Sequence, residues 1–278
     1  MKRIKPTSYT LGILAFALML SVVGCQSSNK KKDAEKTQTV KPLLKKAIEK
    51  EVKDIVYPLP TTFELTSMLN RIGADYILTL SNSTENVDKY FTEKSRALNL
   101  GVYSADLSYA STYQRKQETM LYLKASKTLI DNLEITSAFN KTLVDDVEQN
   151  LDKKDQLVKV ITNSFYDTYE FLNKNGKANL SLLVVSGSFI EGLYIATHIS
   201  ENTFGNPEIV QVIYDQKESL DRLVKVLKPE MKDPNVAAML ADLEGLKKSY
   251  DAIEGSMNEA QLKEITASVE KLRNKIVQ

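Results

Sequence analysis

After its first 25 residues, the most apolar stretch of this chain runs from residue 178 to residue 199 and has the sequence ANLSLLVVSGSFIEGLYIATHI. A helix of this length can cross a membrane. Glu191 near its middle and several Ser and Gly residues argue against a membrane span, so we predict a buried central helix. Gly187 and Gly192 would let a neighbouring backbone approach it closely.

A second stretch, from Leu98 to Tyr113, has a related design. Small residues recur in it at a spacing of three to four, which places them on one face of a helix. A face of this kind suits tight contact with another helix. The small residues are Ala97, Gly101, Ala105 and Ser108.

Helical periodicity continues on both sides of these two stretches, and proline or glycine punctuates it. A first amphipathic helix is expected over 43–56, and the pattern Thr61-x-x-Glu64 matches a capping box that starts the next helix. Further helices are expected at 86–114, 115–131, 133–150, 155–175, 178–201, 207–228, 236–253 and 259–277. We therefore predict an all-α protein, an antiparallel bundle of about nine or ten helices. A helical-repeat solenoid is the runner-up, and a division into two subdomains near residue 150 or 205 stays open.

The composition excludes several classes of protein. The chain has 278 residues with one Cys and one His, too few for a zinc finger, an iron–sulfur site or a disulfide scaffold. Its 10 Gly and 7 Pro are about half the usual share, which disfavours collagen-like and turn-rich all-β folds. The formal net charge of +1 gives no reason to expect a nucleic-acid partner.

The N-terminus carries the most specific motif. Lys2, Arg3 and Lys5 precede an apolar run that starts at Leu11 and ends in Gly24-Cys25. This run is similar to the lipobox of bacterial lipoprotein signals, which signal peptidase II cleaves. The resemblance implies that 1–24 is a signal peptide and that Cys25 becomes the diacylglyceryl-modified, N-acylated first residue. The alternative is an ordinary secretory signal or an uncleaved anchor helix, with Cys25 incidental.

Residues 25–39 are polar and rich in lysine, so we expect a flexible tether between the lipidated cysteine and a helical body at 40–278. The expected partner of this end is the membrane, reached through the lipid. By resemblance to Gram-negative lipoproteins, Gln26 and Ser27 after the cysteine favour the outer membrane. Lysines at 30–32, in place of an acidic patch, favour its periplasmic face.

Two stretches of the body also carry a resemblance. They are LNLGVYSAD at 98–106 and GSFIEGLY at 187–194. Both are similar to segments of uncharacterised all-helical lipoproteins of Bacteroidota-type bacteria. The resemblance brings no known activity with it.

Polar residues of the two central helices form the candidate binding site. If these helices pack through their small residues, their polar faces border one cleft, in which aromatic rings with polar tips suit a ligand. The alternative is that the same residues satisfy one another within the core. The candidate residues are Tyr103, Asp106, Tyr109, Glu191, Tyr194 and His198.

The pair His198-x-x-Glu201 gives a second hypothesis. One helical turn separates the imidazole from the carboxylate, a spacing that can chelate a metal. The pair is similar to the G-x-H-x-x-E signature of imelysin-like helical proteins, with Ala196 in place of the glycine. A metal- or haem-associated uptake protein is therefore the alternative function. A di-iron bundle site needs two Glu-x-x-His pairs, which one histidine cannot supply.

No catalytic motif accompanies these residues. The chain lacks the G-x-S-x-G nucleophile elbow and both phosphate-binding glycine loops. A hydrolase built on two carboxylates is a third hypothesis, although Asp145-Asp146 and Asp167-x-x-Glu170 are better explained as solvated helix faces. We expect a lipid-anchored protein that is not an enzyme, has no cofactor, and binds a partner protein or a small ligand.

Overall fold

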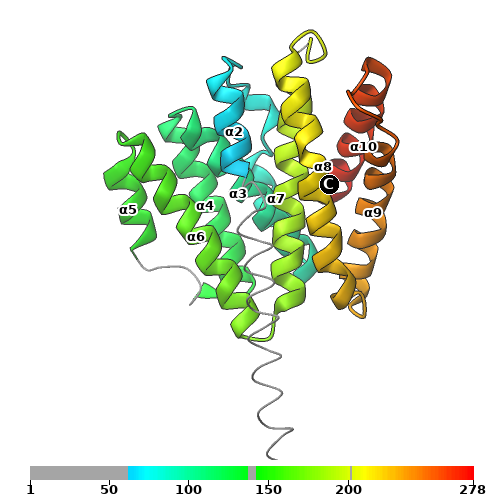
Figure 1. Ribbon diagram of the computed structural model, residues 1–278. Helices are drawn as coiled ribbons and strands as arrows, with labels where there is room; N and C mark the ends of the chain where they lie inside the picture. Colours follow the sequence, from blue (N-terminus) through cyan, green and yellow to red (C-terminus); the bar gives the residue numbers. More distant parts are fainter. Residues whose placement is uncertain (1–61, 137–141, 201) are drawn as a thin grey trace, which may run out of the picture. The chain divides into compact units, whose positions relative to one another are not determined.

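The structure is a computed structural model, and it describes residues 62–136, 142–200 and 202–278 (Figure 1). The expected signal peptide at 1–24, the lipidation site Cys25, the tether at 25–39 and the helix over 43–56 lie outside the described residues. Glu201 and the capping residue Thr61 also lie outside them. The predictions made for these residues remain predictions.

The described residues form nine α-helices and short 3₁₀ helices, with no strand among them. The all-α prediction is therefore confirmed. The helices are α2 (Thr62–Arg71), η1 (Leu78–Leu80), η2 (Thr84–Lys89), α3 (Glu93–Thr112), α4 (Lys116–Asn132), α5 (Leu143–Asn150), α6 (Lys154–Lys174), α7 (Ala178–His198), α8 (Pro207–Leu227), η4 (Lys228–Glu230), α9 (Pro234–Asp251) and α10 (Glu259–Val277).

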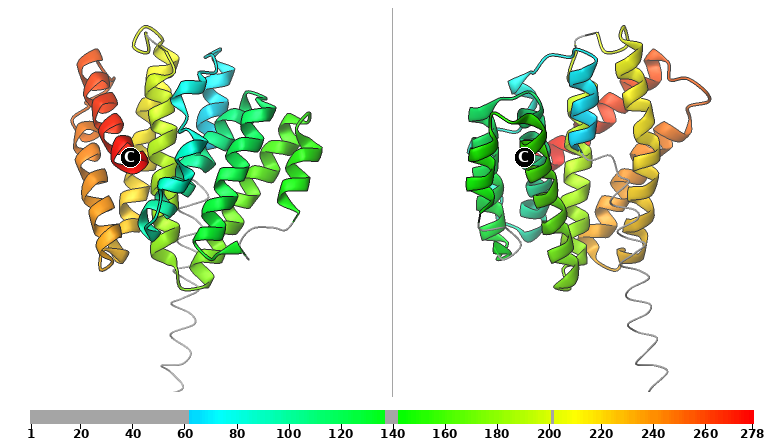
Figure 2. Two further views of the ribbon diagram at one scale, coloured as in Figure 1. Left: turned by 180° about the vertical axis from the view of Figure 1, so that it is seen from behind. Right: turned by 60° about the vertical axis from the view of Figure 1, so that its left-hand side comes forward.

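Helix α7 is the centre of the bundle. It contacts α2, α3, α6, α8, α9 and α10, which come from both ends of the described chain. Figures 1 and 2 show it between α6 and α8, with α9 and α10 on one side and α4 and α5 on the other. A solenoid repeat would touch only its neighbours in sequence, so this arrangement is a bundle.

The burial of α7 agrees with the prediction of a central helix. Among the described residues, α7 is the one helix that is long and apolar enough to cross a membrane. Within its most apolar window, however, 89% of the residues are buried inside the bundle. Its apolar composition is therefore that of a core helix.

The predicted helix boundaries are explained by local chemistry. The Asn206 side chain accepts hydrogen bonds from the first free amides of α8, and Asp233 does the same for α9. A proline follows each of these caps, at the position where its missing N–H matters least. Gly176 ends α6 with φ +74°, a conformation that glycine adopts without strain.

Two predicted helices are wrong over part of their length. The stretch 86–114 is divided into η2 and α3, because Tyr90 between them takes an extended conformation and is buried. Within the described part of the predicted helix over 133–150, the α-helix is α5, from Leu143 to Asn150. Glu134 turns the chain after α4 with φ +56°, and this turn buries Leu133 and Ile135 on either side of it. In both places tertiary burial overrides helical periodicity.

Candidate functional site

The contact between α3 and α7 brings together the candidate residues of these two helices. A Cβ atom on Gly101 would overlap the backbone carbonyl of Val184, and one on Gly187 would overlap the carbonyl of Leu98. The two backbones are thus in direct contact through their glycines, as the small-residue pattern on α3 and Gly187 on α7 indicate. Gly192 differs, because a Cβ atom there would meet the Thr62 side chain.

Four of the six candidate residues are fully buried beside this contact. Tyr103, Asp106, Tyr109 and Glu191 are each 0% exposed, whereas Tyr194 and His198 are half-buried. The two buried tyrosines hold the segment before α3 in place. Tyr103 Oη donates to the carbonyl of Ser83 at 2.8 Å, and Tyr109 Oη accepts from the Ile77 amide at 2.8 Å. Burial raises the pKa of Tyr109 to about 12.

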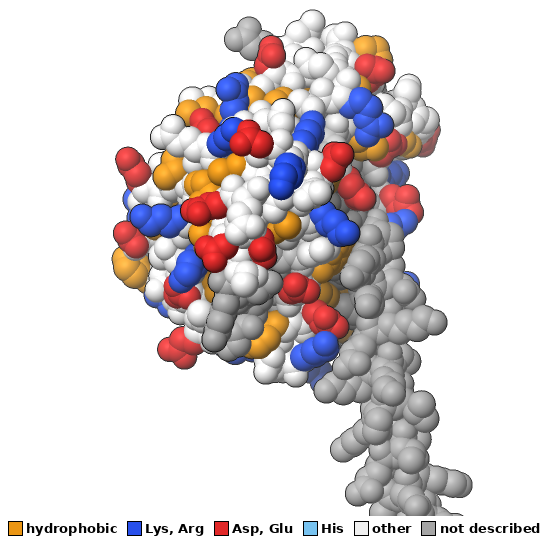
Figure 3. All heavy atoms as spheres, turned by 90° about the vertical axis from the view of Figure 1, so that its left-hand side faces the viewer, with side chains coloured by type: hydrophobic (Ala, Val, Ile, Leu, Met, Phe, Trp, Pro, Cys, Tyr) orange, Lys and Arg blue, Asp and Glu red, His pale blue; other side chains and the backbone are white. Residues whose placement is uncertain are grey.

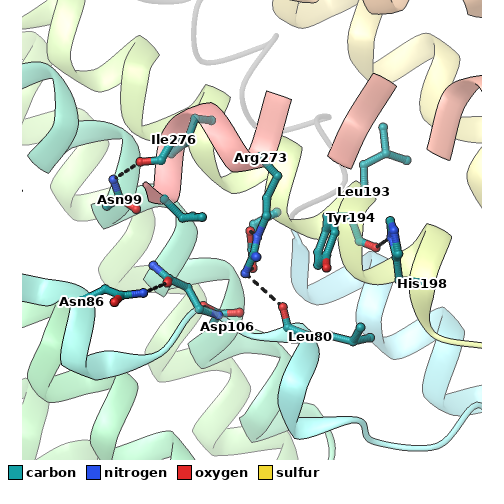
Figure 4. A network of polar contacts seen from close by, with 12 residues as sticks. Leu80, Asn86, Asn99, Asp106, Leu193, Tyr194, His198, Arg273 and Ile276 are labelled. Atoms are coloured by element: carbon teal, nitrogen blue, oxygen red, sulfur yellow. Dashed lines mark hydrogen bonds and ion pairs between the residues drawn. The ribbon is translucent and has the colours of Figure 1, made fainter. Parts of the chain in front are cut away.

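Glu191 is paired with a residue that the sequence did not single out. Arg273 of α10 donates from Nε to Glu191 Oε2 at 3.0 Å and from Nη2 to Oε1 at 3.1 Å. The same Nη2 donates to the carbonyl of Leu80 at 3.1 Å. Figure 4 shows Arg273 reaching toward Leu80, between Asp106 and Tyr194. Such a bidentate contact is the strongest form of arginine–carboxylate pair.

Asp106 lies close to this pair but makes no ion pair with a described residue. Its Oδ2 accepts from the Asn82 amide at 3.1 Å, and its Oδ1 has no hydrogen bond within the described part of the chain. Burial raises the pKa of Asp106 well above its usual range, the charge of Glu191 raises it further, and Arg273 opposes this shift. Two buried carboxyl groups share one cation, so we assign the proton to Asp106 and the ion pair to Glu191. We call Asp106, Glu191 and Arg273 the ionic cluster.

Tyr194 and His198 continue the cluster toward the surface. The Arg273 guanidinium lies over the Tyr194 ring at 4.4 Å, and the rings of Tyr194 and His198 are 4.1 Å apart at their centres. His198 Nδ1 lies 2.9 Å from the Tyr194 carbonyl. Nδ1 also lies 3.0 Å from Thr197 Oγ1, and the tautomer with its proton on Nδ1 donates to the carbonyl and leaves Nε2 as an acceptor.

A pocket on another face of α3 and α7 was not predicted. Residues of helices α2 to α7 line it, and its volume is about 80 Å³. None of the lining residues that the structure describes is charged. Eight are aliphatic, three are Phe and eight carry a hydroxyl, and we call it the hydroxyl pocket. The hydroxyl residues are Thr62, Ser104, Ser108, Ser126, Thr162, Ser164, Thr168 and Ser188.

One hydroxyl of this pocket stands out. Ser126 of α4 is 4% exposed, and its Oγ makes no hydrogen bond with any described residue. A buried hydroxyl without a partner is unusual in a folded protein. It carries the cost of desolvation without the compensating bond.

The metal hypothesis gains little from the described residues. Among them, no group of three or more His, Cys, Asp or Glu side chains is placed to hold a metal ion. Glu201, the predicted partner of His198, lies outside the described residues. The geometry of the His198–Glu201 pair therefore stays a prediction.

The surface of the body offers no single-signed charge patch on the face around α5. Figure 3 shows Lys and Arg side chains there mixed with Asp and Glu, and hydrophobic side chains exposed between them. A nucleic-acid interface needs a basic patch or stripe. This face does not carry one.

No protein-family model matches the chain, and no curated protein or solved structure matches it. The function is therefore argued from the residues and their geometry.

Sequence reasoning identified two members of the ionic cluster and missed the third. Arg273 lies four residues from Val269 and three from Ile276, both buried, so it projects from the apolar face of α10. A charge on such a face is a signal of a buried partner. The sequence signal for the pocket is weaker, because serines on α3, α4 and α7 come together only when these helices pack.

Proposed function

We propose that this protein is a membrane-anchored, non-enzymatic binding protein, attached through lipidated Cys25, whose helical body binds a small apolar ligand in the hydroxyl pocket. The observation that supports ligand binding is the unpartnered Ser126 hydroxyl in a charge-free pocket. No reaction is assigned, because Glu191 and Arg273 beside α7 are paired with each other. They do not line the pocket.

The anchor part of the proposal rests on the lipobox-like run before Cys25, and the outer membrane at its periplasmic face is the proposed location. Cys25→Ser should abolish labelling by radioactive palmitate and cleavage of the leader, since the lipobox resemblance makes both depend on this cysteine. Ser27→Ala is the matched control and should retain both. A Cys25→Ser protein that is still labelled would contradict the assignment of the lipid to this residue.

The ligand part can be tested on the full-length protein extracted from membranes. Native mass spectrometry should detect a bound mass that disappears on denaturation. Ser104→Leu should remove this mass, because a leucine at this pocket position fills the space. Thr128→Leu on α4 is the matched control, since Thr128 also donates to the carbonyl four residues earlier but does not line the pocket.

A bound mass that persists in Ser104→Leu would contradict the choice of pocket. A clean unliganded protein in the wild type would contradict small-ligand binding. It would shift the proposal to a partner protein, to be sought by crosslinking in the native envelope.

A second candidate function is metal- or haem-associated uptake through His198 and Glu201. One observation favours it: the contact of Nδ1 with the Tyr194 carbonyl orients the ring as in many metal sites and leaves Nε2 available. Metal analysis of the purified wild type and of His198→Ala tests it. Metal in the wild type alone supports this function, and metal in neither protein contradicts it.

A further inference from the structure

The chemistry of the hydroxyl pocket restricts the class of ligand, and this inference rests on the proposed function. We infer that the pocket takes an uncharged alcohol or phenol, a compact apolar body whose hydroxyl hydrogen-bonds with Ser126. Three properties of the lining lead to this class: its charge, the direction of its hydrogen bonds and its size.

The charge of the lining excludes an ionic group on the inserted part of the ligand. None of the described residues around the pocket is Asp, Glu, Lys, Arg or His. An ion moved into such a site would lose its hydration and gain no counter-charge. Carboxylates, phosphates and ammonium groups are therefore excluded from the inserted part.

The hydrogen bonds that the lining hydroxyls already make favour a ligand that donates a hydrogen bond. Ser104 Oγ donates to the carbonyl of Leu100 at 2.7 Å, and Thr168 Oγ1 donates to the carbonyl of Ser164 at 2.9 Å. Ser108 Oγ donates to the carbonyl of Ser104 at 2.9 Å. The protons of these hydroxyls are used, and their oxygens retain only lone pairs.

The protons of the hydroxyls at the α2–α7 contact are also used in hydrogen bonds. Thr62 Oγ1 donates to the carbonyl of Ser188 at 3.0 Å, so its single proton is used. The 2.9 Å contact between the two hydroxyls must then run from Ser188 Oγ to Thr62 Oγ1. Five lining hydroxyls are thus acceptors only, and a ligand that offers an O–H complements them better than a ligand that offers an acceptor.

Ser126 differs from these five because its hydroxyl has no partner. It can accept a proton from a ligand hydroxyl or donate to it. Leu123 and Ile130 on the same helix also line the pocket, so an apolar ligand without a hydroxyl would leave Ser126 unsatisfied. The Ser126 hydroxyl should therefore distinguish an alcohol from a hydrocarbon of the same shape.

Size restricts the ligand further. An engineered apolar cavity of about 150 Å³ binds benzene, and the present pocket of about 80 Å³ is smaller. It is, however, partly open, and three half-buried rings lie along it: Phe63, Phe165 and Phe189. A single ring can insert with one edge while these aromatic side chains cover the rest.

Phenol and toluene are the probes that test this inference, because they share a shape and differ in the hydroxyl. Titration calorimetry on the full-length protein, freed of co-purified ligand, should show that phenol binds about three- to tenfold more tightly than toluene. Ser126→Ala should lower this ratio to about one by weakening phenol alone. Ser186→Ala should leave the ratio unchanged, since Ser186 is also buried but bonds to the Leu182 carbonyl and does not line the pocket.

Toluene that binds as tightly as phenol in the wild type would overturn the inference. If Ser104→Leu still abolished that binding, the pocket would remain an apolar site and the proposed function would stand. Binding of neither probe would also overturn the inferred class, and the bound mass in native mass spectrometry would judge the proposed function separately. A phenol preference that survives in Ser126→Ala would overturn the role of this hydroxyl.

Discussion

The ionic cluster and the hydroxyl pocket both border the α3–α7 contact, and they treat buried polar groups in different ways. In the ionic cluster, a long side chain from α10 fills the space and pairs with Glu191. In the hydroxyl pocket, no described side chain fills the space, and the Ser126 hydroxyl has no partner among the described residues. The ion pair of the cluster is satisfied by the protein's own groups, although Asp106 Oδ1 has no partner among the described residues, whereas the pocket has space for a ligand.

This difference indicates where stability and binding are located. A buried ion pair whose partners depend on each other loses much stability when one partner is removed. A pocket with an unpartnered hydroxyl loses little when that hydroxyl is removed. Substitutions in the cluster should therefore act on folding, and substitutions in the pocket should act on binding.

The largest effect is expected from Arg273→Met. It leaves Glu191, which is 0% exposed, without its cation and leaves the Leu80 carbonyl without its donor. Urea unfolding should show a loss of about 3–5 kcal/mol. Arg273→Met combined with Glu191→Gln should recover part of this loss, because a neutral amide is less costly to bury than a charge. A double variant no more stable than Arg273→Met would show that the cluster is not held by charge.

Substitution at the α3–α7 contact, which separates the two regions, should lower the free energy of unfolding nearly as much. In Gly187→Ala the new methyl group overlaps the Leu98 carbonyl, so α3 and α7 must move apart. We expect a loss of about 2–3 kcal/mol in the free energy of unfolding. Gly245→Ala on α9 is the matched control, because nothing lies within 4 Å of the new methyl. It should gain about 0.5–1 kcal/mol, as an exposed helical glycine does when replaced by alanine.

The α3–α7 contact could be predicted from sequence because its signal is local. Gly101 and its small neighbours recur at the helical period, and Gly187 interrupts an otherwise apolar helix. The helix starts at Pro207 and Pro234 could be predicted for the same reason, since proline restricts its own backbone. The fold class followed from such signals.

The candidate site could be predicted only in part, because its partners are distant in sequence. Asp106 and Glu191 were recognised as polar groups on the right helices, but Arg273 joins them from 82 residues beyond Glu191. No local pattern specifies that distance. The pocket around Ser126 is harder still, because a void is a property of six packed helices and leaves no periodic trace.

The ionic cluster should make the free energy of unfolding depend on pH. Burial raises the pKa of Asp106, so the folded state holds a proton that the unfolded state releases above about pH 4. The free energy of unfolding should therefore fall as pH rises from about 4 toward the raised pKa, by up to about 1.4 kcal/mol per pH unit for this group. Glu191 contributes with the same sign, because its pKa is also raised, mainly by burial and against the effect of Arg273.

Asp106→Asn tests this assignment. An amide can keep the bond from the Asn82 N–H but cannot ionise, so the slope of stability against pH should become shallower between pH 5 and pH 9. Urea unfolding across this range measures both slopes. Parallel slopes for Asp106→Asn and the wild type would show that Asp106 is not the group that holds the proton.

The smallest effect is expected in the hydroxyl pocket, where Ser126→Ala removes a buried hydroxyl that makes no hydrogen bond. The unliganded protein should gain up to about 1 kcal/mol, a rise in Tm of about 2–4 °C for a chain of this size. Ser186→Ala should instead lose about 0.5–1.5 kcal/mol, because it breaks the bond to the Leu182 carbonyl. Opposite signs in scanning calorimetry would show that Ser126 is kept at the expense of stability, as expected of a residue retained for binding. A loss of stability in Ser126→Ala would show that its hydroxyl is satisfied in solution, and the contrast with the cluster would then disappear.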